Sequence, residues 1–215
     1  MLGIPLGLLA ANAFEWYAHR YILHEAGRDK KGRAHYHWDH HREVRRNNFR
    51  EPMYDHLLGE EYDRHRFEIE ALVKVSLAVS PLFPIAPLFT ATLWYSAINY
   101  YYCHRKSHDN PEWAREHLPW HVDHHLGRDQ DMNWCVTKPW FDYIMGTRVI
   151  SSEDLKESNP LGIPLPAFVE DRLNALARKY APRAFEKLDA NRAEEARKRA
   201  TGREEDMPDF SRHAA

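Results

Sequence analysis

The chain has 215 residues, a size typical of one domain with a short appendage. Hydrophobic residues make up 43% and charged residues 29%, which excludes a largely disordered or collagen-like chain. A net charge of -2 gives no electrostatic reason to expect nucleic-acid binding, and two widely separated cysteines exclude a disulfide framework or a cysteine-rich zinc site.

The first predicted element is an apolar helix over residues 2–14, which carry no charge. The apolar run continues to Leu23, interrupted only by Glu15, His19 and Arg20. As a helix its uncharged part would span about 20 Å, short of the ~30 Å hydrocarbon core of a bilayer. A signal peptide is disfavoured, because the run lacks a basic start and a small-residue cleavage site. We therefore expect a short or partial membrane helix that continues into the aqueous phase.

A basic segment, residues 28–50, comes next and contains eight arginines and lysines. The tendency of positive charge to stay inside the cell predicts that this segment is cytoplasmic.

The second apolar stretch, residues 71–102, carries one charge, Lys74. Prolines at positions 81, 84 and 87 argue against one straight helix and favour two short helices joined by a turn at 81–87. Such a hairpin in the membrane would return residues 103–150 to the cytoplasmic side, and its tyrosines and tryptophan at 94–102 suit an interfacial belt. The alternative is a buried helical hairpin in a soluble core.

The chain changes character after residue 150. Residues 166–201 are rich in both signs of charge and predict one or two solvated amphipathic helices broken at Pro182. We therefore divide the chain into a main region, residues 1–150, and a charged helical C-terminal tail, residues 151–215.

Histidine is unusually frequent, with 15 residues, and ten of them fall into four short groups. In chain order the groups are HRYILH, HWDHH, HRKSH and HVDHH, with their histidines at His19 and His24; His37, His40 and His41; His104 and His108; and His121, His124 and His125.

The spacing suits metal binding. Positions i, i+3 and i+4 share one face of an α-helix, so each HxxHH group and the HxxxH pair can direct imidazoles at one ion or two neighbouring ions. His19 and His24 differ, because five residues rotate about 140° around an α-helix. Either the helix bends between them or the two side chains address different ions.

Ten imidazoles without a cysteine ligand favour iron, zinc or copper, and they outnumber the four to six ligands of one ion. The sequence therefore predicts two ions. The other five histidines, His35, His56, His65, His117 and His213, are expected at the surface or beside the site, and His117 is the strongest further ligand candidate because it precedes His121 by about one turn.

Asp39 and Asp123 occupy matching places in the two HxxHH groups. Each points away from the metal-facing side of its own helix. We predict either that they hold histidines of neighbouring helices in place or that they are surface carboxylates.

The four histidine groups in this order around an apolar hairpin resemble the boxes of the fatty acid hydroxylase (sterol desaturase-like) superfamily. The run NWCVTKPWFDYIMGT, residues 133–147, is similar to that family's closing motif and adds Asn133 and Asp142 as candidates that support the site. The resemblance covers residues 12–148. Cys135 departs from it, since the family usually has glycine there, and the apolar content is lower than in a typical member.

The resemblance implies an all-α fold: a membrane-embedded helical bundle, integral or monotopic, with a cytoplasmic helical cap that carries the dimetal site. It implies that the ten histidines bind two iron ions, with zinc as a possible substitute, and that O2 and two electrons hydroxylate an unactivated C–H bond of a lipid-like or apolar substrate. The electrons would come from a separate ferredoxin- or cytochrome-type partner with its reductase.

Two alternatives stay open at this stage. One is a desaturase or a carotenoid-ring hydroxylase that uses the same metal chemistry. The other is a non-catalytic zinc-binding membrane protein that stores or senses the metal.

Overall fold

The structure, a computed structural model, describes residues 2–55, 62–127, 129–150 and 159–200. Within these ranges every regular element is a helix, which confirms the predicted all-α class.

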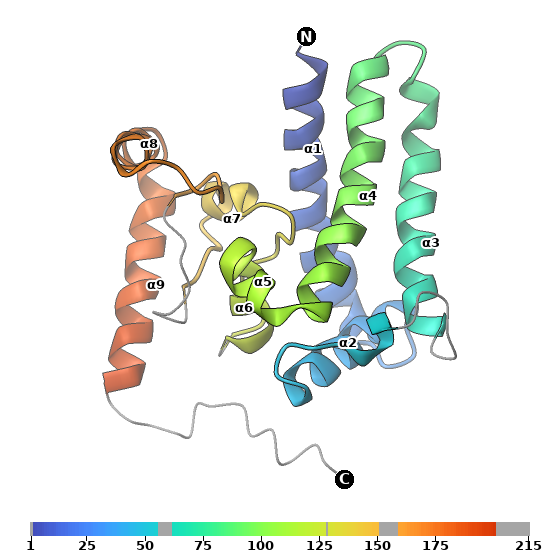
Figure 1. Ribbon diagram of the computed structural model, residues 1–215, viewed down its shortest axis with the longest axis horizontal. Coiled ribbons are helices and arrows are strands. Elements are labelled where there is room, and N and C mark those ends of the chain that lie inside the picture. The colour runs from blue at the N-terminus through green and yellow to red at the C-terminus, as the bar shows by residue number, and fades with distance from the viewer. Residues whose placement is uncertain (1, 56–61, 128, 151–158, 201–215) are drawn as a thin grey trace.

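Three helices, α1 (Gly3–Tyr17), α3 (Tyr62–Val79) and α4 (Pro87–Asp109), run side by side (Figure 1). The α1 and α4 backbones approach closely because Gly7 has no side chain: a Cβ there would lie 2.7 Å from Cβ of Thr92. Trp94 of α4 donates a hydrogen bond to the Ser76 carbonyl of α3 (3.2 Å). These contacts join the three helices into one layer.

Helices α3 and α4 form the predicted hairpin. A short 3₁₀ turn, η5 (Ser80–Leu82), and residues 83–86 connect them, close to the predicted turn. The two helices are longer than expected, at 18 and 23 residues, because both continue past the apolar stretch into charged sequence that reaches the histidine region.

Many apolar side chains of this layer are exposed. We call them the apolar face; they are Leu2, Ile4, Leu6, Leu9, Val73, Leu77, Leu82, Phe83, Ile85, Leu88, Tyr95, Ile98 and Tyr102. In the part of the chain that the structure describes, none of the helices combines the length and apolar character needed to cross a membrane. Membrane embedding therefore stays a prediction.

The histidine-bearing elements lie together at the end of the layer that is away from the turn between α3 and α4 (Figure 1). Helix α1 continues as a π-helix, η1 (Ala18–Glu25), and two 3₁₀ turns, η2 (Ala26–Arg28) and η3 (Arg33–His35), lead into α2 (Tyr36–Arg46). The 3₁₀ turn η4 (Pro52–Asp55) contacts α4. Two short helices, α5 (Pro111–His117) and α6 (Pro119–Leu126), follow α4, and α7 (Trp140–Met145) lies beyond them.

The tail forms α8 (Ala167–Tyr180) and α9 (Pro182–Ala200), so the helix breaks near Pro182 as predicted. It is not only solvated: Phe185 and Leu188 of α9 pack with Tyr143 of α7 in a small buried cluster. Residues 151–158 and 201–215 of the predicted tail, with His56 and His213, lie outside the described residues, as does the side chain of His65.

Candidate metal centre

The structure brings nine of the ten predicted ligands into two groups of converging ring nitrogens. The first group comprises His19, His24, His37, His41 and His124, and the second comprises His40, His104, His108 and His125. His121 adjoins the second group, with its Nε2 atom 3.2 Å from Nε2 of His108. All ten side chains are buried, with at most 5% of their surface exposed. The two groups could each hold a metal ion.

The two HxxHH helices are divided between the groups. In α2, His37 and His41 join the first group and His40 joins the second. In α6 the assignment is reversed: His124 joins the first group, while His125 belongs to the second and His121 adjoins it. Adjacent residues point about 100° apart on a helix, so each helix lies between the groups and supplies both.

The π-helix resolves the five-residue spacing of His19 and His24. In π geometry hydrogen bonds join residues i and i+5, which brings the two side chains to one side of the helix. Their ring centroids lie 5.1 Å apart and both belong to the first group. Neither predicted alternative describes this region: the helix widens instead of bending, and both side chains join one group instead of addressing different ions.

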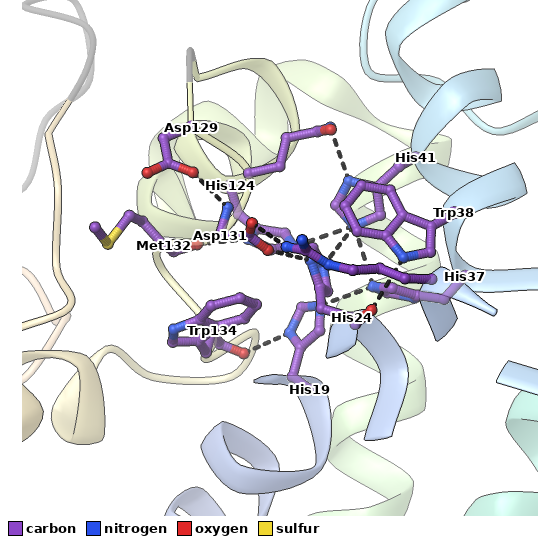
Figure 2. Close-up of polar contacts among 12 residues, drawn as sticks. His19, His24, His37, Trp38, His41, His124, Asp129, Asp131, Met132 and Trp134 are labelled. Carbon is purple, nitrogen blue, oxygen red and sulfur yellow. Dashed lines mark hydrogen bonds and ion pairs between the residues drawn. The ribbon is translucent and has the colours of Figure 1, made fainter. Parts of the chain in front are cut away.

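In the first group, three nitrogens converge on one atom (Figure 2). Nε2 of His41 lies 3.1 Å from Nε2 of His37 and 3.2 Å from the Nε2 atoms of His24 and His124. An imidazole nitrogen carries either one hydrogen or one lone pair. Three such contacts to a single nitrogen cannot all be hydrogen bonds, whereas ligands around one ion adopt this arrangement.

The opposite ring nitrogens of this group are held from outside. Nδ1 of His19 donates to the Trp134 carbonyl (2.5 Å) and Nδ1 of His124 to the Met132 carbonyl (2.6 Å). Nδ1 of His24 donates to the carboxylate of Asp131 (3.2 Å), as Figure 2 shows. The side-chain amide nitrogen of Gln130 donates to Nδ1 of His41 (2.9 Å), so this ring carries its proton on Nε2 in this arrangement. In His19, His24 and His124 a proton fixed on Nδ1 leaves the lone pair on Nε2, which faces the group.

The second group is held in the same way but by different acceptors. Nδ1 of His40 donates to Glu51 (3.0 Å), and Nδ1 of His104 donates to Glu68 (2.7 Å). Nδ1 of His108 donates to the Phe49 carbonyl (2.9 Å). Both glutamates are buried, and Tyr54 donates a further hydrogen bond to Glu68 (2.7 Å).

Burial keeps these imidazoles neutral. It lowers the pKa of His37, His41 and His124 well below the usual value near 6.5, and neighbouring histidines lower it further. The same causes act on His108, His121 and His125. A neutral imidazole has the lone pair that a metal requires, so proton release need not precede metal binding near pH 7.

His125 gives the clearest sign of a missing partner. Both of its ring nitrogens are buried, and neither has a hydrogen-bond partner among the residues that the structure describes. An unpaired buried polar atom costs about 1–3 kcal/mol, and two on one ring are unusual. A metal ion in the second group would satisfy one of them.

The spacing also fits. With metal–nitrogen bonds of about 2.0–2.1 Å, neighbouring ligand nitrogens lie about 2.9–3.4 Å apart. Contacts between Nε2 atoms of the first group run from 2.9 Å for His19 and His37 to 3.2 Å for His24 and His41, and Nε2 of His121, beside the second group, lies 3.2 Å from Nε2 of His108. The residues therefore fit two ions, and imidazole donors alone do not choose among iron, zinc and copper.

A small cavity of about 20 Å³ touches both groups. Its walls include histidines of each group and several other side chains: Leu23, Tyr36, His37, His40, Met53, Tyr54, Glu68, Tyr100 and His104. The volume suits a molecule about the size of water and is far too small for a lipid. Leu23, Tyr36 and Tyr100 are half-buried, so this wall extends from the cavity to the protein surface.

The segment 133–147 shapes the loop that serves the first group. The buried carboxylate of Asp142 accepts hydrogen bonds from the amides of Trp134 (2.9 Å) and Cys135 (2.8 Å) and from the Thr147 hydroxyl (2.7 Å). Asn133, in the left-handed region at φ 58°, binds the backbone of Val149 through both ends of its side chain. Both predicted supporting residues thus act on the loop that carries the Trp134 and Met132 carbonyls.

The two matching aspartates have different environments. Asp123 is buried and forms an ion pair with buried Arg148 (2.9 Å), which fastens α6 to the loop. Asp39 is partly exposed and pairs with Arg42 on its own helix. Asp39 therefore lies at the surface, as one of the two predicted alternatives had it, and the Asp123–Arg148 pair is a buried clamp.

His117 lies outside both groups. Its side chain is 47% exposed, and its ring hydrogen bonds to the Trp113 carbonyl (3.0 Å) and stacks on the Trp113 ring. His35 is half-buried and binds the Gly27 carbonyl (2.8 Å). Both positions agree with the prediction that these histidines lie at the surface or beside the site. His117 belongs to neither group, so it is not a ligand candidate in this arrangement.

Sequence reasoning missed the side chains that hold the histidines in place: Glu51, Glu68, Asp131, Gln130 and Tyr54. Glu51 and Glu68 belong to no histidine group and share no spacing with one. The only available signal was the general need of ligating histidines for an acceptor at the second nitrogen, which does not say which carboxylate supplies it.

Comparison with known protein families, with characterised proteins and with solved structures finds no match to this chain.

Proposed function

We propose that this protein is a membrane-bound non-haem di-iron monooxygenase that hydroxylates an unactivated C–H bond of a lipid-like or apolar substrate. The overall reaction consumes one O2, two electrons and two protons and yields the alcohol and one water. The observation that carries the proposal is the pair of adjacent, buried, all-histidine groups that share two HxxHH helices. The order of these boxes in the sequence, which resembles the fatty acid hydroxylase superfamily, selects oxygen chemistry among the uses of such a pair.

Two iron ions bound by the ten histidines would supply the oxygen activation and the oxidation of the C–H bond. The chain itself binds and orients. Acceptors at Nδ1 fix the rings of His19, His24 and His124 in the first group and of His40, His104 and His108 in the second. Rings held in this way need little rearrangement when the oxidation state of the centre changes.

The cavity beside both groups would exclude bulk water and admit a small molecule. Its volume of about 20 Å³ leaves room for little else, so a substrate C–H bond must reach it by displacing part of the wall. Leu23, Tyr36 and Tyr100 are the half-buried members of that wall. We infer that the substrate presents a narrow apolar segment at this point.

The apolar face supports a membrane-bound state. It comprises exposed aliphatic and aromatic side chains on α1, α3, α4 and the turn between α3 and α4, and many exposed apolar side chains favour contact with lipid or other molecules. The elements that carry the histidines, η1, α2, α6 and the C-terminal end of α4, lie at the end of the layer away from the turn between α3 and α4 (Figure 1). In the proposed arrangement the apolar face enters the bilayer, integrally or in one leaflet, and the metal centre faces the cytoplasm. A ferredoxin- or cytochrome-type donor with its reductase supplies the electrons there.

The decisive test is oxygen incorporation. Protein from iron-supplied cells, purified in detergent without chelators, is given a lipid extract, a reductase–ferredoxin pair and ¹⁸O2. We expect two iron ions per chain and a hydroxylated lipid that carries ¹⁸O. His41→Ala and His124→Ala should abolish the product, while the exposed His117→Ala should retain it and serves as the matched control.

Other outcomes select the alternatives. A double bond formed with O2 consumption but without ¹⁸O in the lipid would indicate desaturation, and labelled carotenoid rings would indicate ring hydroxylation. Two tightly bound zinc ions, with iron-loaded protein that consumes no O2, would favour the non-catalytic metal protein. Product from His41→Ala at the wild-type rate would refute the metal-centre assignment.

A further inference from the structure

The two histidine groups have nearly equal donor sets but unequal surroundings. Five imidazoles form the first group, and the second has four with His121 beside it. Neutral donors therefore give neither group a clear advantage. The charges in contact with the histidines, in contrast, differ between the two groups.

The second group is backed by two buried carboxylates. Glu51 is 1% exposed and accepts from His40, and Glu68 is 7% exposed and accepts from His104. Little water surrounds these charges, so their field at a nearby cation is weakly screened. A carboxylate on Nδ1 also makes the imidazole a stronger donor through Nε2.

The first group has weaker electrostatic support. Two of its acceptors are neutral carbonyls, those of Trp134 and Met132. Its one acidic acceptor, Asp131, is 43% exposed and also pairs with Arg28, which is 60% exposed. Solvent and the guanidinium both reduce the effect of that carboxylate on a bound cation. A cationic side chain also lies on the side of the second group, where the Arg105 guanidinium donates a hydrogen bond to the Tyr54 carbonyl (3.0 Å).

We propose that the two groups hold their ions unequally: the second group, backed by Glu51 and Glu68, is the high-affinity site, and the first group is the exchangeable site that fills last and empties first. This rests on the proposed dimetal centre but not on its oxygenase activity. It also gives the centre a loading order, in which protein with one equivalent of metal carries it at the second group.

The order is testable with Zn²⁺, which needs no redox control. Metal-free full-length protein in detergent is titrated against a chromophoric chelator, and bound zinc is counted by mass spectrometry. We expect two steps that differ at least about tenfold in affinity, since changing the partner of a ligating histidine alters affinity about 10–100-fold. His108→Ala should remove the tight step, and His19→Ala should remove the weak one.

The carboxylates are tested by isosteric change. Glu51→Gln and Glu68→Gln keep an oxygen acceptor for the histidine and remove the charge, so each should weaken the tight step about 10–100-fold and leave the weak step unchanged. Asp131→Asn is the matched control at the first group, and it should change only the weak step, by less than about tenfold. If a glutamine variant fails to fold, anomalous diffraction from wild-type crystals with one equivalent of zinc should still place the ion at the second group.

Several results would overturn the inference: equal affinities in the wild-type protein, a single ion at the first group, or an unchanged tight step in both glutamine variants. Its failure is distinct from failure of the oxygenase proposal. Unequal binding without ¹⁸O incorporation would leave the loading order standing, and turnover by protein with two equivalent sites would refute only the loading order. Protein that binds no metal would refute both.

Discussion

Two pairs of histidines, one from each group, show how imidazoles converge in the same way from different kinds of helix. His104 and His108 are four residues apart on α4, a regular α-helix, and both join the second group. His19 and His24 are five apart on η1, a π-helix, and both join the first group. The chain adopts a rarer helix where the spacing requires it, so the convergence of ligands, and not ideal helix geometry, determines the local backbone.

The hydrogen-bond acceptors that support the two pairs differ as well. The first group relies on carbonyls of the loop that Asp142 organises, whereas the second relies on side chains of η4, α3 and the segment before η4. Changes in the loop should therefore affect one group and spare the other.

Acidification should have the largest effect, and it should act on both groups at once. In the metal-free folded chain, burial lowers the pKa of all five histidines in the first group, of two in the second and of His121. Their unfolded pKa is about 6.5, so below that pH the unfolded chain binds more protons and stability falls as pH falls. Each histidine then costs up to about 1.4 kcal/mol per pH unit.

We expect metal-free protein to lose its helical circular dichroism cooperatively between about pH 6.5 and pH 5. Protein with two zinc ions should unfold at lower pH, because protons must displace the metal first. Stability that is constant down to pH 5 in the metal-free chain would contradict the buried neutral histidines.

Removal of the Asp142 carboxylate should damage the first group alone. Asp142→Ala leaves the buried amides of Trp134 and Cys135 without their acceptor, at about 1–3 kcal/mol each. We expect a loss of about 3 kcal/mol in urea unfolding and weaker binding of one of the two ions. Asp39→Ala, on an exposed ion pair, is the control and should change stability by less than about 0.5 kcal/mol. Equal weakening of both ions would show that the loop supports the whole centre.

The HxxHH helices were the most predictable part of this centre. Local spacing decides which face of a helix a histidine occupies, and α2 and α6 carry their ligands as the pattern indicates. The acceptors were not predictable, because Glu51 and Glu68 reach His40 and His104 only through packing of segments distant in sequence. Asp39 and Asp123 make the same point: identical positions in two copies of one motif differ because Arg148 covers only one of them.

The spacing itself can be exchanged between the pairs. Insertion of one alanine between Arg105 and Lys106 would give α4 the five-residue spacing, and an α-helix would then turn His108 about 100° away from its group. We expect this variant to lose the tightly bound ion. Deletion of Ile22, which is 46% exposed, would give η1 a four-residue spacing that an α-helix satisfies, and both ions should be retained within about tenfold in affinity. Loss of an ion on deletion would show that the π geometry is itself required.

A smaller change should test how far the support of the first group extends along α1. Trp16 lies one turn before His19 and donates a hydrogen bond to the Thr147 hydroxyl (2.9 Å), which in turn donates to Asp142 (2.7 Å). Trp16→Phe removes the outer bond and keeps most of the apolar contact with Trp134 and Cys135. We expect a loss of about 1 kcal/mol in urea unfolding, because a net hydrogen bond contributes about that much.

The same variant should show whether the loop loses its support of the first group gradually or all at once. Because Asp142 keeps its two amide partners in Trp16→Phe, the Trp134 carbonyl should stay near His19, and zinc affinity of the first group should fall by less than about threefold. The second group should bind as in the wild-type protein. A fall in zinc affinity as large as that of Asp142→Ala would mean that the loop responds as one cooperative unit. Helix α1 would then fix the first group through Trp16 as firmly as through His19.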